Sequence, residues 1–288
     1  MNAPDARVGV VGATGAVGTV TLRLLRERGY ENVRAFASAR SAGRDLDGGV
    51  AVEGGALVVD KSSAYRLEEG YPLVVPEVNG DRAAEAIATT RVVANPNCSS
   101  IPLTCVLEPL REAAGLRRVR VSTYQAVSGA GAQRMEQLRG EPAEEHDLGF
   151  DWPWEGDETE EESKIRAETR KILELPELPL SATTVRIPVL VGHSQSVWVE
   201  TEEPLSPEQV ESVLASASGV RLVETPTSRA ATETEDVLVG RIRPDRAAEG
   251  NGLVLFLACD NLVKGAALNA LQIAELLLDA TSSASRAA

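Results

Sequence analysis

The feature that most constrains this fold is a glycine-rich turn between a short strand and a helix near the N-terminus. Residues 7–11 form an apolar run suited to a buried strand, and the turn GATGAVG follows. The next residues have an apolar helical period that ends at Gly29, a common helix terminator. Gly12, Gly15 and Gly18 would let a pyrophosphate approach the backbone at the helix N-terminus. The pattern predicts a dinucleotide-binding βα unit, although close packing alone could also require these glycines.

The residues after the next strand, predicted over 32–37, bear on which dinucleotide would bind. Folds that prefer NAD usually place an acidic residue there, whereas NADP-binding folds place an arginine. Ser38, Arg40 and Ser41 occupy this stretch, and the first acidic residue after them is Asp45. NADP is therefore the preferred cofactor, and the alternative is an ordinary surface arginine.

The segment 41–55 is too short for the pattern around it. Further short strands are predicted over 56–60, 73–79 and 91–97, and a βα unit with its return strand needs about 30 residues. No complete unit fits between residue 41 and the strand at 56–60. The first hundred residues therefore indicate a Rossmann-like domain that lacks one βα unit.

Longer strands follow from residue 117, and they predict a second domain with a mixed sheet. Helices are expected near 159–173 and 206–217, and a last helix precedes a small-residue tail that we expect to be disordered. The acidic stretch 141–162 is interpreted as a solvated loop.

Composition excludes several classes of protein. The chain has 288 residues and a formal net charge of −14, which disfavours nucleic acid and anionic membranes as partners. No apolar run reaches the roughly 18 residues that span a bilayer, and the N-terminus lacks a signal peptide's pattern. Three separated cysteines and two histidines offer neither a standard zinc site nor a disulfide framework. We expect a cytoplasmic protein that holds no metal.

Cys98 and His193 are the residue types that acyl-thioester chemistry needs. Cys98 follows the sequence NPN at the start of a predicted helix, whose dipole would stabilise a thiolate. His193 lies near the end of a predicted strand, seven residues after Arg186. The alternatives are a buried inert thiol, which suits Cys105 better, and a structural histidine.

Taken together, the motifs resemble the aspartate-semialdehyde dehydrogenase family. They run in family order along almost the whole chain: GATGAVG, SARSAGR, SSAYR, PLVVPEVN, ANPNCSS, STYQAVSGAG, EESK, ETRKIL, VRIPVLVGHS and DNLVKGAALNALQIAE. The resemblance implies NADPH-dependent reductive dephosphorylation of L-aspartyl 4-phosphate to L-aspartate 4-semialdehyde. It also implies a homodimer or homotetramer that acts on a small acyl phosphate or semialdehyde.

The resemblance carries roles over to particular residues. It implies that Cys98 is the nucleophile, His193 the acid/base and Gln125 the residue that orients Cys98 and the substrate. Arg186 would bind the substrate carboxylate, Glu161 its amino group, and Lys164 with Arg66 the phosphate. The full set of implied substrate contacts is Arg66, Glu161, Lys164, Arg186, Ser128 and Gly129. The implied cofactor contacts are Gly12, Thr14, Gly15, Ala16, Val17, Ser38, Arg40, Ser41 and Asn261.

The predicted fold class is therefore α/β, with two domains. A truncated Rossmann-like NADP-binding domain spans 1–97 and 264–288 and lacks one βα unit near 41–55. An α+β catalytic and dimerisation domain with a mixed sheet spans 98–263.

Departures from the family pattern leave three hypotheses open. The family carries a strand, a Ser-Ala-Gly-Gly loop and a helix where this chain has only 41–55; Lys61 and Pro102 replace an Asn and a Gln. The first hypothesis is a working dehydrogenase. The second is an enzyme that uses the Cys98 thioester for acyl transfer or hydrolysis without NADP. The third is a non-catalytic paralogue.

Overall fold

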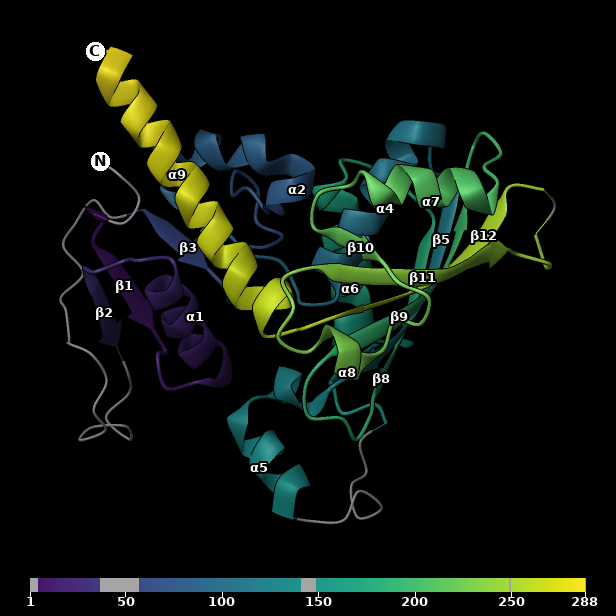
Figure 1. Ribbon diagram of the computed structural model, residues 1–288, viewed down its shortest axis with the longest axis horizontal. Coiled ribbons are helices and arrows are strands. Elements are labelled where there is room, and N and C mark those ends of the chain that lie inside the picture. The colour runs from purple at the N-terminus through teal and green to yellow at the C-terminus, as the bar shows by residue number, and fades with distance from the viewer. Residues whose placement is uncertain (1–4, 37–56, 141–148, 249, 288) are drawn as a thin grey trace. The chain divides into compact units, whose positions relative to one another are not determined.

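The computed structural model describes residues 5–36, 57–140, 149–248 and 250–287 (Figure 1). The chain divides into two compact units, the first made of Met1–Pro96 with Ala266–Ala288 and the second of Asn97–Gly265. No helix in the described ranges is long and apolar enough to cross a membrane.

The first unit begins with the strand, turn and helix that the sequence predicts. β1 (Val8–Val11) pairs in parallel with β2 (Val33–Phe36), and α1 (Ala16–Glu27) connects them. Gly12 has a φ of 74°, in the left-handed region that glycine adopts without strain. A Cβ on Gly18 would lie 2.2 Å from the carbonyl oxygen of Gly12. Glycine at both positions therefore allows α1 to start tightly against the turn.

A second parallel strand pair and its helices form the rest of the first unit. β3 (Val58–Asp60) pairs with β4 (Val92–Ala94). The helices of this part are α2 (Pro76–Asn79), η3 (Gly80–Ala84), α3 (Glu85–Ala88) and α9 (Leu268–Ala287). Their shared core consists of Val74, Ala83, Ala86, Val93, Ile273 and Leu277. Among the described strands, the two pairs are separate sheets.

Two predictions for the first unit are wrong. The sequence predicts a strand over 73–79, but only Leu73 makes a strand-like bridge, and Pro76 begins α2. Proline suits the first helical position because its fixed φ matches the helix and its missing N–H has no partner to lose. The predicted disordered tail is also wrong, since α9 continues to Ala287. The predicted deletion at 41–55 lies outside the described residues.

The second unit is built on a six-stranded mixed sheet, which confirms the predicted fold class. Its strands, in spatial order, are β10 (Val220–Leu222), β11 (Val237–Pro244), β12 (Gly252–Cys259), β9 (His193–Glu200), β5 (Arg118–Gln125) and β8 (Leu180–Arg186). The pairs β10–β11 and β5–β8 are parallel, and the remaining three pairs are antiparallel.

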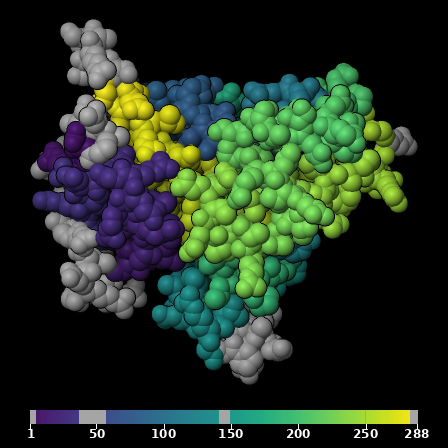
Figure 2. Space-filling model, in the orientation of Figure 1, coloured from purple at the N-terminus to yellow at the C-terminus, as the bar shows by residue number. Residues whose placement is uncertain are grey.

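Three helices cover one face of this sheet. α4 (Ser100–Ala114), α6 (Glu160–Ile172) and α7 (Pro207–Ala215) pack on β12, β8 and β11 respectively. On the other face, called the open face below, the short helix α8 (Ser228–Ala231) packs at one end, and Arg120 and Ser181 are exposed further along the described strands. β5 shows the two faces by alternation, since Val119 and Val121 are buried while Arg120 between them is exposed. In the space-filling view, green and yellow-green residues from α7 to β12 make up much of the visible surface of this unit (Figure 2).

Short elements complete the second unit. They are η4 (Val127–Ala130), α5 (Ala132–Gly140), β6 (Trp154–Glu155), β7 (Glu158–Thr159), α8 (Ser228–Ala231) and the π-helical η6 (Val263–Ala267). The β6–β7 hairpin lies within 141–162, so the predicted loop is wrong there, while 141–148 lies outside the described residues. α6 confirms the helix predicted near 159–173. α6 begins at Thr159 because Thr159 and Glu162 form a reciprocal capping box.

Candidate active site

Cys98 lies in the first turn of the helical segment that becomes α4. The Asn97 side chain accepts a hydrogen bond from the Ser99 N–H at 2.7 Å, and the Asn97 carbonyl accepts one from Ile101 at 3.1 Å. Asn97 therefore caps this turn, and the positive end of the helix dipole favours negative charge on the Cys98 sulfur. A Cβ on Gly265 would lie 3.1 Å from the Cys98 Cβ, so glycine allows the close approach of η6.

His193 contacts Cys98 directly, although 95 residues separate them in the chain. Its Nε2 lies 3.3 Å from the Cys98 Sγ, and its Nδ1 accepts a hydrogen bond from the Ala126 N–H at 3.0 Å. Because Nδ1 accepts, the neutral ring carries its hydrogen on Nε2, facing the sulfur. Burial first, and the positive charge of Arg186 second, lower the pKa of His193 to about 3. His193 is therefore neutral at physiological pH.

Glu161 connects the side chains around Cys98. Its carboxylate accepts hydrogen bonds from Gln125 Nε2 at 2.9 Å and from Asn97 Nδ2 at 3.0 Å, and the residue is only 6% exposed. Seven residues further along α6, about two turns, the fully buried Glu168 accepts the Asn97 N–H at 2.6 Å. Glu161 thus binds the side-chain amide of Asn97, and Glu168 binds its backbone N–H. Two carboxylates of α6 therefore fix the residue that precedes Cys98.

Arg186 ends β8 beside the same group. Its Nη1 donates to the Ala126 carbonyl at 3.0 Å and lies 3.5 Å from Gln125 Oε1. Its Nε donates to Asp151, and the Trp152 ring lies 4.2 Å from its Cζ. The guanidinium is buried, and these contacts therefore fix its orientation.

The turn η4 passes close to Arg186 and His193 at Gly129. A Cβ on Gly129 would lie 3.0 Å from Arg186 Nη1 and 3.3 Å from His193 Nε2. Ser128 is held in place by Asn261, whose Nδ2 donates to Ser128 Oγ at 2.8 Å. Asn261 also accepts the N–H of Gly192 at 2.9 Å, which fixes the residue before His193.

The structure brings together predicted residues of three kinds. The second unit contains the predicted catalytic residues Cys98, His193 and Gln125, the predicted substrate contacts Glu161, Arg186, Ser128 and Gly129, and the predicted cofactor contact Asn261, and the contacts above link them. Lys164 lies on α6 one turn after Glu161, and it forms an ion pair with Glu160. Arg66 belongs to the first unit, where its Nη2 donates to the Lys61 carbonyl at 3.0 Å.

The predicted cofactor residues divide between described and undescribed parts of the chain. Gly12, Thr14, Gly15, Ala16 and Val17 form the turn and first helical residues of α1 in the first unit. Gly15 is the N-cap residue of α1, and it has no side chain that could accept a hydrogen bond from the first N–H groups of the helix. These N–H groups also have no partner within the helix itself. This end of α1 therefore fits a diphosphate. Ser38, Arg40 and Ser41 lie outside the described residues.

Sequence reasoning missed several residues that shape the site. Asn97, Glu168 and the Ala126 N–H each fix a predicted residue, and Asp151 with Trp152 contacts Arg186. Asn97 stood next to Cys98 in the quoted motif, and Glu168 follows Glu161 by seven residues on the same helical face. These two positions relative to Cys98 and Glu161 could have indicated that Asn97 and Glu168 belong to the site. No local sequence pattern indicated Asp151.

Comparisons with known proteins show which family the chain resembles. The family model described as semialdehyde dehydrogenase, NAD binding domain, matches residues 7–51, and the dimerisation domain model matches 107–153 and 153–264. The chain is 40% identical to aspartate-semialdehyde dehydrogenase of Corynebacterium glutamicum, covering 94% of this chain and 99% of the relative. The Aquifex aeolicus enzyme of the same name is 38% identical, with 94% and 98% coverage.

A solved structure shows the same likeness in three dimensions. Aspartate semialdehyde dehydrogenase II of Vibrio cholerae, complexed with ASA, has a TM-score of 0.87 and 34% identity, covering 96% of this chain and 98% of that chain. This chain is shorter than its relatives: 94% of its 288 residues is about 271, aligned over 342 positions, so about 70 positions of the Corynebacterium protein have no counterpart. The chain belongs to the aspartate-semialdehyde dehydrogenase family.

Proposed function

We propose that this chain catalyses the NADPH-dependent reductive dephosphorylation of L-aspartyl 4-phosphate to L-aspartate 4-semialdehyde through a thioester on Cys98. The observation that carries the proposal is the 3.3 Å contact between Cys98 Sγ and His193 Nε2, with Arg186 beside it. The relatives named for this activity at 38–40% identity support it.

Cys98 performs the first step as a thiolate. Its sulfur attacks the acyl carbon of the acyl phosphate, the S–C bond forms, and the C–O bond to phosphate breaks with release of inorganic phosphate. Lys164 of the second unit is a candidate phosphate ligand, as the resemblance implies. The helical turn that starts at Asn97 favours the charged sulfur before the attack and after product release.

His193 acts in this proposal as a neutral hydrogen-bond donor. The sequence predicts an acid/base, but its Nδ1 already accepts the Ala126 N–H, so Nε2 has a hydrogen to donate and no free lone pair to accept a proton. The Nε2–H faces the place where the carbonyl oxygen of a Cys98 adduct develops negative charge. Collapse of the reduced adduct returns that charge to sulfur as the S–C bond breaks, and this step needs no proton acceptor.

Arg186 and Glu161 are the residues considered for the carboxylate and the amino group of the substrate. Arg186 lies beside Gly129 and can bind the carboxylate through its guanidinium. The resemblance implies that Glu161 binds the amino group. Glu161 already accepts hydrogen bonds from Gln125 and Asn97, so we assign it instead to orienting those two amides.

The glycine turn of the first unit is the proposed nucleotide site. Gly12, Gly15 and the N–H groups of Ala16 and Val17 would hold the diphosphate of NADP at the start of α1. Bound NADPH supplies the hydride that reduces the thioester. The preference for NADP over NAD rests on Arg40 and its neighbours and stays a prediction from sequence.

A second candidate function is a thioester enzyme without the redox step. The shortness of the chain relative to its relatives favours it, because about 70 aligned positions are missing while the contacts of Cys98 with His193 and of Asn97 with Glu161 and Glu168 are present. Such an enzyme would acylate Cys98 and then transfer the acyl group to water or another nucleophile. A non-catalytic paralogue has no such observation in its favour, since the contacts around Cys98 are retained.

Two assays separate these functions. The enzyme is mixed with NADP, L-aspartate 4-semialdehyde and phosphate, and the absorbance of NADPH is followed. We expect phosphate-dependent turnover that disappears in Cys98→Ala and persists in Cys105→Ala, a matched change at the buried cysteine of α4. In the second assay, L-aspartyl 4-phosphate replaces the semialdehyde and NADP is left out, so that the thiolate of Cys98 can displace phosphate and form a thioester without a redox step. Acylation of Cys98 in this assay by an enzyme that forms no NADPH in the first would support the redox-silent enzyme, and neither reaction would support the paralogue.

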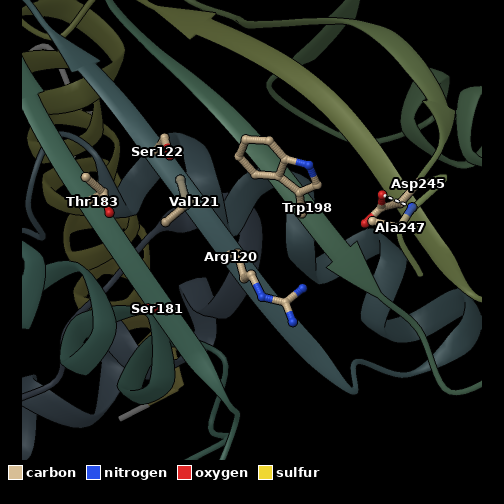
Figure 3. A pocket seen from close by; sticks show the side chains of 8 residues that line it. All are labelled: Arg120, Val121, Ser122, Ser181, Thr183, Trp198, Asp245 and Ala247. Carbon is tan, nitrogen blue, oxygen red and sulfur yellow. Dashed lines mark hydrogen bonds between the residues drawn. The ribbon is translucent and has the colours of Figure 1, made fainter. Parts of the chain in front are cut away.

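We also propose that the enzyme is a cytoplasmic homodimer that pairs through the open face of the sheet. The dimerisation domain model covers these strands. A depression of about 380 Å³ on this face is lined by side chains of neighbouring strands, among them Arg120, Ser122, Thr183 and Trp198, with Asp245 at its edge (Figure 3). This depression lies away from Cys98, so we interpret it as a partner surface. The three cysteines are all free, as is typical of reducing compartments.

A further inference from the structure

The residues just before the β6–β7 hairpin form a fixed contact with Arg186. The Gly149 carbonyl accepts the N–H of Arg186 at 2.8 Å, and the Pro153 carbonyl accepts the N–H of Glu160 at 2.8 Å. These two backbone bonds anchor the segment on β8 at one end and on α6 at the other. Asp151, between the anchors, is therefore held in place beside the guanidinium.

Asp151 occupies one side of Arg186. Its two carboxylate oxygens lie 3.2 and 3.3 Å from Arg186 Nε, and the side chains are 17% and 4% exposed. The Asp151 backbone is at the surface, but its charged group is turned inward. Trp152 stacks over the guanidinium, and Nη1 is directed to the Ala126 carbonyl. Within the described ranges, Nη2 is the nitrogen that no hydrogen bond occupies.

This arrangement changes what Arg186 offers to a substrate. A carboxylate usually binds arginine through two parallel N–H bonds, and Asp151 already takes the Nε–H that one such pair needs. It also brings a negative charge into a largely buried site, where charges are screened less than in water. A substrate carboxylate at Arg186 therefore meets an arginine whose charge is already compensated.

We propose that Asp151 is a specificity-determining residue: it weakens the preference of the site for a carboxylate over a neutral group at the position of Arg186. The proposal deepens the proposed function, because it concerns the substrate end that Arg186 binds. The Cys98 site then discriminates less strongly for the free carboxylate of the semialdehyde than an uncompensated arginine would.

The test uses Asp151→Asn, which keeps an oxygen to accept the Nε–H but removes the charge. The first readout is the rate of Cys98 alkylation by iodoacetate divided by the rate for iodoacetamide, measured by mass spectrometry of the Cys98 peptide. Iodoacetate carries a carboxylate where iodoacetamide carries a neutral amide. Because both reagents alkylate the same sulfur, a change in the reactivity of that sulfur affects both rates and cancels in their ratio. We expect the ratio to rise about tenfold, as removal of one nearby like charge predicts. Asp157→Asn, an exposed change in the turn of the same hairpin, should leave the ratio unchanged.

The second readout is steady-state kinetics with L-aspartate 4-semialdehyde. Asp151→Asn should lower KM and leave kcat close to that of the unaltered enzyme. An unchanged or lower alkylation ratio overturns the proposal. So does a parallel fall of both alkylation rates with a lower unfolding temperature, because Asp151 would then act only as structural support. A raised ratio in an enzyme that never reduces NADP supports the role of Asp151 and removes the dehydrogenase function.

Discussion

The protonation state of His193 decides which chemistry the residues around Cys98 can perform. Burial and Arg186 lower the pKa of His193 from 6.5 to about 3, while the unfolded chain keeps the ordinary value. Below pH 6.5 the unfolded state therefore binds a proton that native His193 does not take up until about pH 3. Its contribution to stability is complete above pH 6.5 and is lost as the pH falls through that window.

This difference predicts a measurable pH dependence of unfolding. Between pH 7 and pH 5, His193 alone should lower the free energy of unfolding by about 2 kcal/mol. Urea titrations of the unaltered enzyme and of His193→Gln at both pH values isolate this contribution, because the carboxylates common to both proteins cancel. Equal pH dependence in the two proteins would show that His193 titrates normally in the native state.

Glu168 should affect catalysis without touching the substrate. It is fully buried and accepts the Asn97 N–H at 2.6 Å, a charge-assisted bond of the kind that contributes about 1.5–3 kcal/mol. We expect Glu168→Gln to lower stability by about that amount and kcat severalfold, with a smaller change in KM, because Cys98 loses its fixed position. Chemical unfolding and steady-state kinetics measure both effects. Glu211→Gln, an exposed change on α7, is the control and should alter neither quantity.

At the scale of elements, α6 and α7 begin with similar capping boxes, and comparing them distinguishes an effect on stability from an effect on catalysis. α6 begins with Thr159 and Glu162, and α7 begins with Ser206 and Gln209. Loss of either cap costs about 1 kcal/mol, but only α6 carries side chains that hold Asn97. The box of α6 is also buried and contacts Thr184.

Thr159→Ala should therefore lower both the unfolding temperature and kcat, whereas Ser206→Ala should lower only the unfolding temperature. Thermal unfolding and initial rates on both variants provide the comparison, and Thr159→Ser should restore most of the loss. Equal kcat values for the two alanine variants would mean that the start of α6 does not position the site.

The same elements show what the sequence could and could not predict. The apolar patterns predicted the longer strands of the mixed sheet and the helices α4 and α6, because each depends on residues close in the chain, but not the three-residue strand β10. The strand predicted over 73–79 was wrong, because the apolar run there suits a strand but Pro76 begins the helix α2. Asp151 was missed because its contact with Arg186 joins segments 35 residues apart, and no local pattern records such a pairing.

At the scale of the whole molecule, the open face of the sheet is the feature that a single chain leaves unexplained. On this face the Tyr124 and Phe256 rings stack 6.0 Å apart, and Trp198 and Ser122 line the depression nearby. Aromatic side chains of this kind are enriched in protein interfaces. These aromatic side chains support the proposal that a second copy packs on the open face.

Ser122→Arg should break that pairing. It places a long cation in the centre of the face, beside Arg120, where a partner would have to bury it without a matching charge. Light scattering after gel filtration should report about 61 kDa for the unaltered enzyme and 30.5 kDa for the variant, since one chain is 30.5 kDa. Ser218→Arg, an exposed change just after α7, adds the same charge away from the face and should remain dimeric. A dimer that survives Ser122→Arg and separates with Ser218→Arg would place the interface elsewhere, and the open face would then need another partner.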